Sequence, residues 1–293
     1  MTDRAAYIRG ARLTIWTPRP DPTTRLGAFF GAVVPNALVV ENLRITWSVK
    51  KDGTSKPNAA TISINNLAET SRAEVGRLPK RMALEVGYNG RLRQLWVGDL
   101  THATHDKDGV TWTTTLVGAD GSRAFKHAIV NRSLVAGTTV LQAVREAATA
   151  LGLQVPAAVT TRTDLAKQFV NGVALFGRAA AEMTKLLEPL GLSWSIQDGE
   201  LVILDPVAVR PGDALVLDQP AGLIGSPSLG APDKPGGRPK LSARCLVYPE
   251  IQPGRLLAVR SLTVNGRFRC EAVTHTGCNM DGDMMTELEA KPL

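Results

Sequence analysis

The residues best suited to bind a metal are three cysteines and a histidine near the end of the chain. Cys270, His275 and Cys278 lie within nine residues, and Cys245 could supply a fourth ligand. A structural zinc site usually contains a closely spaced Cys-x-x-Cys pair, which this chain lacks. We therefore predict free thiols that pack as small apolar side chains, with no bound metal and no cofactor.

Two other arrangements could carry out catalysis. Cys278 and His275 are the only local thiol and base, but local spacing alone does not define such a site. Asp99 and Asp120 each neighbour a glycine at a predicted strand end and could act as paired carboxylates; an aspartate there more commonly hydrogen-bonds its own backbone in a turn. The other histidines follow no ligand spacing: His102, His105 and His127. With no glycine-rich phosphate loop either, we predict a protein that is not an enzyme and has no catalytic residues.

The net charge of +7 raises the question of nucleic-acid binding, which requires basic residues gathered on one face. The arginines and lysines are instead scattered among acidic residues, as over residues 72–93. The densest basic run, at 234–240, is rich in Pro and Gly and is predicted as a loop. We interpret the charge as a solvated surface and expect no sequence-specific nucleic-acid binding.

Length and composition are those of an ordinary globular protein. The 293 residues are enough for about two domains and for a core that needs no disulfide or metal. No apolar run is long enough to span a membrane, and the first residues lack the apolar segment of a secretory signal. An odd number of cysteines is not a disulfide framework, so we expect synthesis in a reducing cytoplasm.

The elements that position these residues centre on a β-meander. Apolar residues alternate with polar ones from Met82 to Tyr88, and Asn89-Gly90 suits a two-residue type I′ turn. The chain returns through residues 95–97 and turns again near residue 109. The third run, at 110–117, alternates β-branched and aromatic residues, so the sequence predicts three antiparallel strands here.

The rest of the first part predicts more strands, a short helix and a long loop. Alternating runs occur at 7–16, 43–49 and 60–66. Asn66 and Glu69 have the spacing of a capping box, which predicts a helix over 67–78. The Pro-rich residues 17–36 predict a loop of the length that is often functional. Exposed aromatic residues need a cover, so we expect Phe29 and Phe30 to contact a partner or another subunit.

From residue 125 the pattern changes to helices and then returns to strands. Apolar residues spaced by three and four predict helices over 140–151 and 174–190, separated by an irregular segment. The runs 192–196 and 201–204 flank Asp198-Gly199 and predict a hairpin. Further strands are predicted at 214–217, 222–224, 241–248, 255–264, 267–275 and 285–288. The predicted fold class is α+β, mainly β, with antiparallel β domains at 1–124 and 206–293 on either side of a small α+β module at 125–205.

Several short motifs follow one another in a definite order along the chain. They are ISINNL (62–67), VGY (86–88), VGDL (97–100), LVGADG (116–121), AGTT (136–139), LSW (192–194), GELVI (199–203), LIGSP (223–227), CLVYP (245–249), NGRF (265–268) and VTH (273–275). Their order and spacing resemble those of phage tail baseplate hub proteins of the late control protein D type. The chain departs from that pattern near its end, where Gly277-Cys278 and Met284-Met285 stand in place of a Gly-Asp pair and a tryptophan.

This resemblance implies a structural role in a tail baseplate. Hubs of this kind are trimers in which two tube-like β domains per chain form a ring that joins the sixfold tail tube to the threefold central spike. The implied partners are further copies of the chain, tail tube or distal tail proteins, the spike, the tape measure protein and other baseplate proteins. The implied location is the virion, after synthesis in the host cytoplasm. Two alternatives stay open: a tail-associated cell-wall hydrolase, and a channel component, since residues 174–204 resemble the small domains of secretin-type outer-membrane channels.

Overall fold

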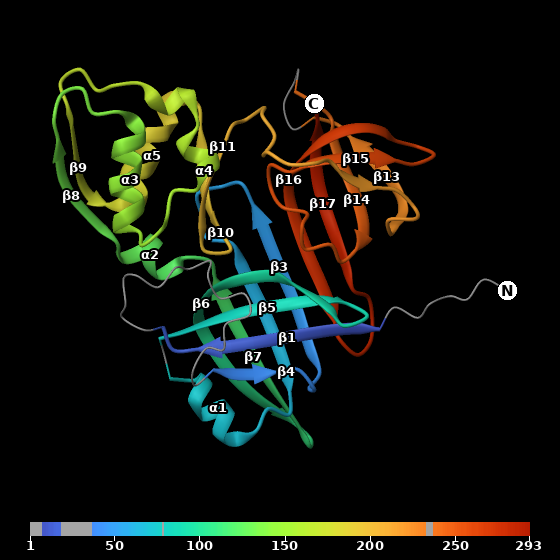
Figure 1. The fold of residues 1–293 in the computed structure, drawn as a ribbon. Coiled ribbons are helices and arrows are strands. Elements are labelled where there is room, and N and C mark those ends of the chain that lie inside the picture. The colour runs from blue at the N-terminus through green and yellow to red at the C-terminus, as the bar shows by residue number, and fades with distance from the viewer. Residues whose placement is uncertain (1–7, 19–36, 78, 233–236) are drawn as a thin grey trace.

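A large, mostly antiparallel sheet runs through most of the molecule (Figure 1). The computed structural model describes residues 8–18, 37–77, 79–232 and 237–293; the predicted contact residues Phe29 and Phe30 lie outside these ranges. The strand order is β13-β14-β17-β16-β3-β4-β7-β6-β5-β1-β2, and β15 joins β16 and pairs in parallel with β12. This architecture confirms the predicted fold class, α+β and mainly β.

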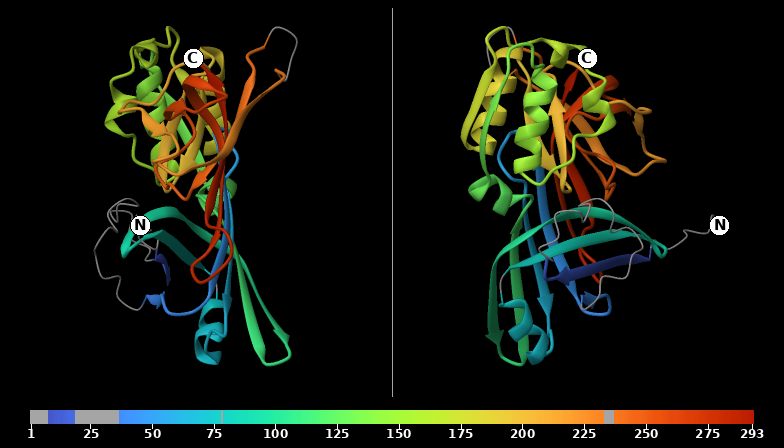
Figure 2. Two further views of the ribbon diagram at one scale, coloured as in Figure 1. Left: turned by 90° about the vertical axis from the view of Figure 1, so that its right-hand side faces the viewer. Right: turned by 60° about the vertical axis from the view of Figure 1, so that its left-hand side comes forward.

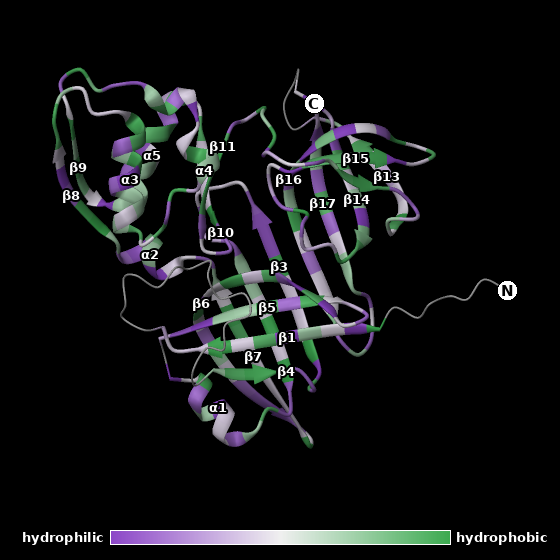
Figure 3. Cartoon of the chain, in the orientation of Figure 1, coloured by the Kyte–Doolittle hydropathy of each residue, from purple (hydrophilic) through white to green (hydrophobic). Residues whose placement is uncertain are grey.

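The strands of this sheet come from the first and last parts of the chain. The first part supplies β1 (Arg9–Trp16), β2 (Leu38–Val40), β3 (Ile45–Asp52), β4 (Ala59–Asn65), β5 (Lys80–Tyr88), β6 (Arg91–Asp108) and β7 (Thr111–Ala119). The last part supplies β12 (Leu215–Leu217), β13 (Leu223–Gly230), β14 (Lys240–Leu246), β15 (Leu256–Arg260), β16 (Asn265–Cys278) and β17 (Met285–Pro292). A short helix, α1 (Glu69–Val75), follows β4. Apolar and hydrophilic residues alternate along many strands (Figure 3), as expected when one sheet face covers a core.

The two β parts join where β3 pairs with β16. The register there runs from Ala272 opposite Asp52 to Cys278 opposite Thr46. Each part nevertheless has its own hydrophobic cluster, one built around Leu13, Ile62 and Trp96, the other around Leu241, Phe268 and Leu288. One hydrogen-bonded sheet therefore connects two separate cores.

The middle of the chain folds into a small α+β module with a third hydrophobic cluster. Its elements are α2 (Ser122–His127), β8 (Ile129–Leu134), α3 (Val140–Ala150), α4 (Ala157–Thr160), β9 (Val173–Arg178), α5 (Ala179–Leu187), β10 (Ser193–Gln197) and β11 (Glu200–Leu204), with 3-10 turns at Thr163–Ala166 and Glu188–Leu190. Figure 1 shows α3 and α5 between the β8–β9 ribbon and the β10–β11 hairpin. Among the described residues, no helix is long and apolar enough to cross a membrane.

Two local predictions were wrong. The helix predicted over 174–190 starts at Ala179, because residues up to Arg178 form β9 and pair with β8. The capping box at Asn66 does not form: Ala68 is the N-cap of α1 and no side chain caps it. Asn66 instead adopts a left-handed φ of 57° and accepts a hydrogen bond from the Trp112 amide at 3.0 Å.

Two predicted hairpin turns are confirmed. Asn89 and Gly90 have φ values of 53° and 74°, and Asp198 and Gly199 have 55° and 86°. Positive φ at both central residues is the signature of a type I′ turn, whose twist matches that of the flanking strands. The second of these turns carries the side chain on which the candidate site depends.

Candidate functional site

The residues considered as zinc ligands are buried in the sheet of the last β part. All three cysteines are buried free thiols, and the described residues contain no group of three or more His, Cys, Asp or Glu side chains placed to hold a metal. Burial raises the pKa of the Cys245 thiol to about 12 and also raises the pKa of Cys270. Since the thiolate is the nucleophilic form, these two side chains are poor nucleophiles.

His275 and Cys278 do not form a nucleophile pair. They are three residues apart on β16, and side chains separated by an odd number of positions on a strand point to opposite faces. His275 is fully buried, and its Nδ1 lies 2.8 Å from Thr286 Oγ1. Burial, reinforced by the charge of Lys51, lowers the pKa of His275 to about 3. This imidazole is therefore neutral at ordinary pH.

Asp99 and Asp120 have separate hydrogen-bond partners. Neither carboxylate accepts a hydrogen bond from the backbone of its own turn. Asp99 Oδ2 accepts from the Arg123 amide at 2.9 Å, and its Oδ1 lies 3.5 Å from Arg81 Nε. Asp120 Oδ1 accepts from the Gly199 amide at 3.2 Å. Each carboxylate thus connects segments that are distant in sequence. Both side chains therefore have a structural role.

A buried polar junction forms where the module meets both β parts, and it consists of Lys51, Asp120, Asp198 and Gln252. Lys51 on β3 is 1% exposed, and its Nζ lies 2.9 and 2.7 Å from the two carboxylate oxygens of Asp198. Gln252, in the loop after β14, donates to Asp198 Oδ2 at 3.0 Å. The turn between β10 and β11 is therefore bonded to the first and the last β part at once.

Glycine at position 121 allows this hairpin to approach the sheet. Gly121, just after β7, has a φ of 62°, and a Cβ placed there would lie 2.6 Å from Ile196 Cδ1. The Asn58 side chain also donates to the Ile196 carbonyl at 3.2 Å in a buried position. The hairpin is thus held by close packing as well as by the polar junction.

The electrostatics of the junction favour a proton on Asp120. Burial is the largest cause and the neighbouring charge of Asp198 the next, and together they raise the pKa of Asp120 to about 8 against the opposing effects of Lys51 and Arg81. A neutral Asp120 leaves one anion, Asp198, for one cation, Lys51. A charge-balanced set of this kind joins parts of a fold: Lys51 and Asp120 are buried, while Asp198 and Gln252 reach the wall of a neighbouring groove.

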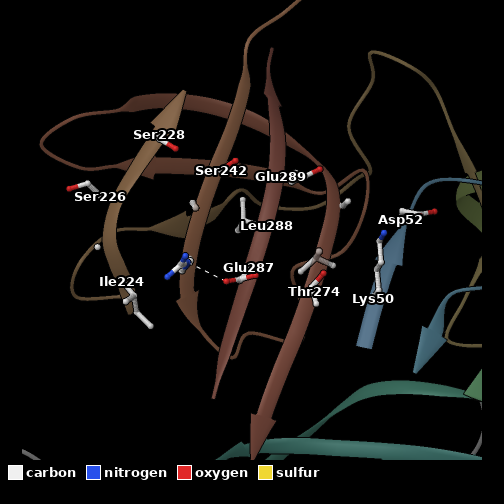
Figure 4. Close-up of a pocket in the computed structure, with 15 residues that line it drawn as sticks. Lys50, Asp52, Ile224, Ser226, Ser228, Ser242, Thr274, Glu287, Leu288 and Glu289 are labelled. Carbon is white, nitrogen blue, oxygen red and sulfur yellow. Dashed lines mark ion pairs between the residues drawn. The ribbon is translucent and has the colours of Figure 1, made fainter. Parts of the chain in front are cut away.

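A second feature is a broad groove on the open face of β13, β14, β17, β16 and β3 (Figure 4). Its volume is about 750 Å³. Two of its lining glutamates are ion-paired. Arg244 Nε, also in the lining, lies 3.2 Å from Glu287 Oε1, and Glu289 Oε2 lies 2.6 Å from Nζ of Lys240, which is outside the lining. Its hydroxyl groups come from Ser226, Ser228, Ser242 and Thr274. Hydroxyls and both signs of charge distinguish this lining from the mostly apolar lining of small-molecule pockets.

Sequence reasoning missed the polar junction. Lys51 continues the inward phase of Ile45, Trp47 and Val49 on β3, and a buried lysine needs an anionic partner. The alternation of buried and exposed residues along β3 could therefore have predicted that Lys51 is buried. Its partner, Asp198, is 147 residues away and was visible only as a turn residue.

Comparisons with known proteins support the fold. No family model and no curated protein matches the sequence. Among solved structures, the 43 kDa tail protein of prophage MuSo2 from Shewanella oneidensis is similar with a TM-score of 0.60 and 11% identity, over 87% of this chain and 94% of that one. A tail protein from Neisseria meningitidis MC58 gives 0.58 and 13% identity, over 96% of each chain.

A third similar structure is the E. coli c3393 protein, described as a component of the type VI secretion system with structural similarity to the T4 bacteriophage tail proteins gp27 and gp5. Its TM-score is 0.56 at 14% identity, over 85% of this chain and 73% of that one. The chain therefore has the fold of phage tail proteins, which agrees with its resemblance to baseplate hub-type proteins.

Proposed function

We propose that this protein is a structural hub of a bacteriophage tail or phage-tail-like particle, forming a trimeric ring that joins the sixfold tail tube to the threefold central spike. The observation that carries the proposal is the continuous sheet that unites two β parts with separate cores. The fold similarity to tail proteins supports the same assignment.

The sheet offers two comparable sets of long strands. One set is β3, β4, β7 and β6, and the other is β16, β17, β14 and β13; they adjoin through β3 and β16. Three chains would supply six such sets, which fits a junction between sixfold and threefold symmetry. Closed cyclic assembly is also the usual outcome for soluble homo-oligomers. We propose domain limits of 1–124, 125–205 and 206–293 on this basis.

Among the described residues, this run of strands has two edges without a neighbouring strand, one along part of β6 and one along β13. Strand β5 pairs with β6 only as far as Leu100, so residues 101–108 have no outer neighbour among the described residues, and β13 ends the sheet on the other side. Figure 2 shows the β6–β7 hairpin (green) and the β13–β14 strands (orange) at opposite ends of the molecule. We propose that the β6 side of one chain contacts the β13 side of the next.

Both edges carry features that discourage indiscriminate pairing. The β6 edge holds Asp106, Lys107 and Asp108, and β13 holds Pro227 within a register shift between Ile224 and Ser228. Charges, proline and bulges are common means of protecting exposed edges. We therefore propose that the isolated protein stays monomeric until tube, spike, tape measure or other baseplate partners nucleate the ring in the virion.

A structural role without enzymatic activity fits the site geometry. Asp99 and Asp120 bind backbone amides of distant segments, and Cys245 and Cys270 are buried with raised pKa values. No observation favours the alternative of a cell-wall hydrolase. The secretin-like alternative rested on a helix over 174–190, and the first part of that segment is a strand.

Counting copies in purified particles tests the proposal. Cryo-electron microscopy or quantitative mass spectrometry should find three copies per particle beside six tube subunits per layer, with the tube subunit as the internal standard. Six copies of this chain, or a β part lying outside the ring, would exclude the proposed hub.

A further inference from the structure

The α+β module is fastened to the rest of the chain through the turn between β10 and β11. Asp198 in this turn binds Lys51 of β3 and Gln252 of the loop after β14. The next residue, Gly199, donates its amide hydrogen to Asp120, which follows β7. The strength of this attachment therefore depends on the charge state of the polar junction.

The junction contains more carboxylates than cations free to pair with them. Lys51 is bonded to both oxygens of Asp198, and Arg81 lies at ion-pair distance from Asp99. Asp120 is 1% exposed, and its Oδ2 has no hydrogen-bond partner among the described residues. A buried carboxylate that is ionised but poorly paired is strongly disfavoured, so the geometry itself calls for a proton on Asp120.

Three charged side chains act directly on Asp120: Asp198 in the β10–β11 turn, Lys51 on β3 and Arg81 on β5. A second set acts on these cations or is acted on by them: Asp99 (β6), Arg123 (α2) and His275 (β16). Asp198 opposes ionisation of Asp120, whereas Lys51 and Arg81 favour it. Arg123 acts on Arg81, and Lys51 acts on His275. The protonation state of Asp120 therefore sets the net charge of the junction.

We propose that Asp120 is a proton-dependent latch for the α+β module: the β10–β11 hairpin docks firmly while Asp120 carries a proton and loosens when that proton is lost.

The direction of the pH dependence follows from comparing the two states. The docked state raises the pKa of Asp120 from 3.8 to about 8, and contact with water in the undocked state returns it toward its ordinary value. The contribution of Asp120 to docking is therefore largest below about pH 4, falls as the pH rises, and is constant above about pH 8, where both states are ionised. A pKa difference of this kind changes the docking constant by up to about tenfold per pH unit within that window.

Hydrogen exchange at the Gly199 amide measures the latch directly, because this amide is the donor to Asp120. NMR on the full chain at pH 5.5, 6.5, 7.5 and 8.5, corrected for the intrinsic exchange rate, gives its protection factor. The factor should fall by up to about tenfold per pH unit to about pH 8 and then level off. The amide of Ile62, within the β3–β4–β7 sheet, serves as an internal control without this trend.

Matched variants separate the latch from general destabilisation. Asp120→Asn keeps a neutral acceptor for Gly199 and should abolish the pH dependence, whereas Asp99→Asn, a second buried carboxylate beside Arg81, should retain it. Asp198→Asn removes the repulsive neighbour but also the ion pair with Lys51, so it should lower the Gly199 protection factor at every pH and, in addition, move the pH window to lower values. The position of the window, rather than the overall protection, tests the idea if Asp120→Asn does not fold. A Gly199 protection factor that is independent of pH in the wild type, or an equal slope in Asp120→Asn, would overturn the proposal.

Discussion

At the scale of single residues, the buried ion pair between Lys51 and Asp198 matters through the cost of breaking it. Replacing both members of a buried pair is often tolerated, but removing one leaves an uncompensated charge in the interior. Lys51 is 1% exposed and the Asp198 side chain 13%. Neither group can therefore regain full hydration in the folded state when its partner is lost.

Lys51→Met should lower the free energy of unfolding by about 3–5 kcal/mol, measured by urea denaturation at pH 7. Lys50→Met is the matched control: Lys50 is exposed on the opposite face of the same strand, and its loss should change stability by no more than about 0.5 kcal/mol. Adding Asp198→Asn to Lys51→Met should recover part of the loss. Equal effects of the two lysine substitutions would contradict the structural role of the pair.

At the scale of elements, residue patterns predicted the strands well where alternation and turns agreed. The meander from Met82 to Val117 is present with its Asn89-Gly90 turn. The pattern failed at 174–190, because Leu175, Ala179 and Met183 are helically spaced although Leu175 belongs to β9. Its partner strand β8 lies some forty residues earlier, and no local signal reveals that pairing.

The candidate site was less predictable than the fold for the same reason. Asp120 and Asp198 were each recognisable as turn residues, but their meeting at one lysine depends on how the module docks on the sheet. Local sequence specifies the β10–β11 turn, and tertiary packing specifies what the turn touches. Gly121 is where this packing can be tested apart from the turn itself.

Gly121→Ala should destabilise the protein more than Gly90→Ala. Both glycines have positive φ, 62° and 74°, so each alanine meets a similar backbone penalty of about 1 kcal/mol. Only the Cβ at position 121 would meet Ile196, at 2.6 Å, while position 90 has nothing within 4 Å. Urea unfolding of the two variants isolates the contribution of hairpin docking. Equal losses would show that the hairpin does not pack closely on Gly121.

At the scale of the whole molecule, the proposed ring requires the two sheet edges to meet between chains. Thr104 on β6 and Ser228 on β13 both belong to these edges. In particles assembled from the double variant Thr104→Cys and Ser228→Cys, a short thiol cross-linker should produce dimers and closed trimers. Each single variant, and the isolated double variant before assembly, should remain monomeric. The native thiols are buried and should not contribute.

Three copies per particle without cross-links would leave the proposed hub function intact but place the contact between chains on another surface, because only the edge pairing would have failed. Cross-linked species larger than trimers would instead contradict the threefold ring, since a closed ring of three chains has no further free edge to extend.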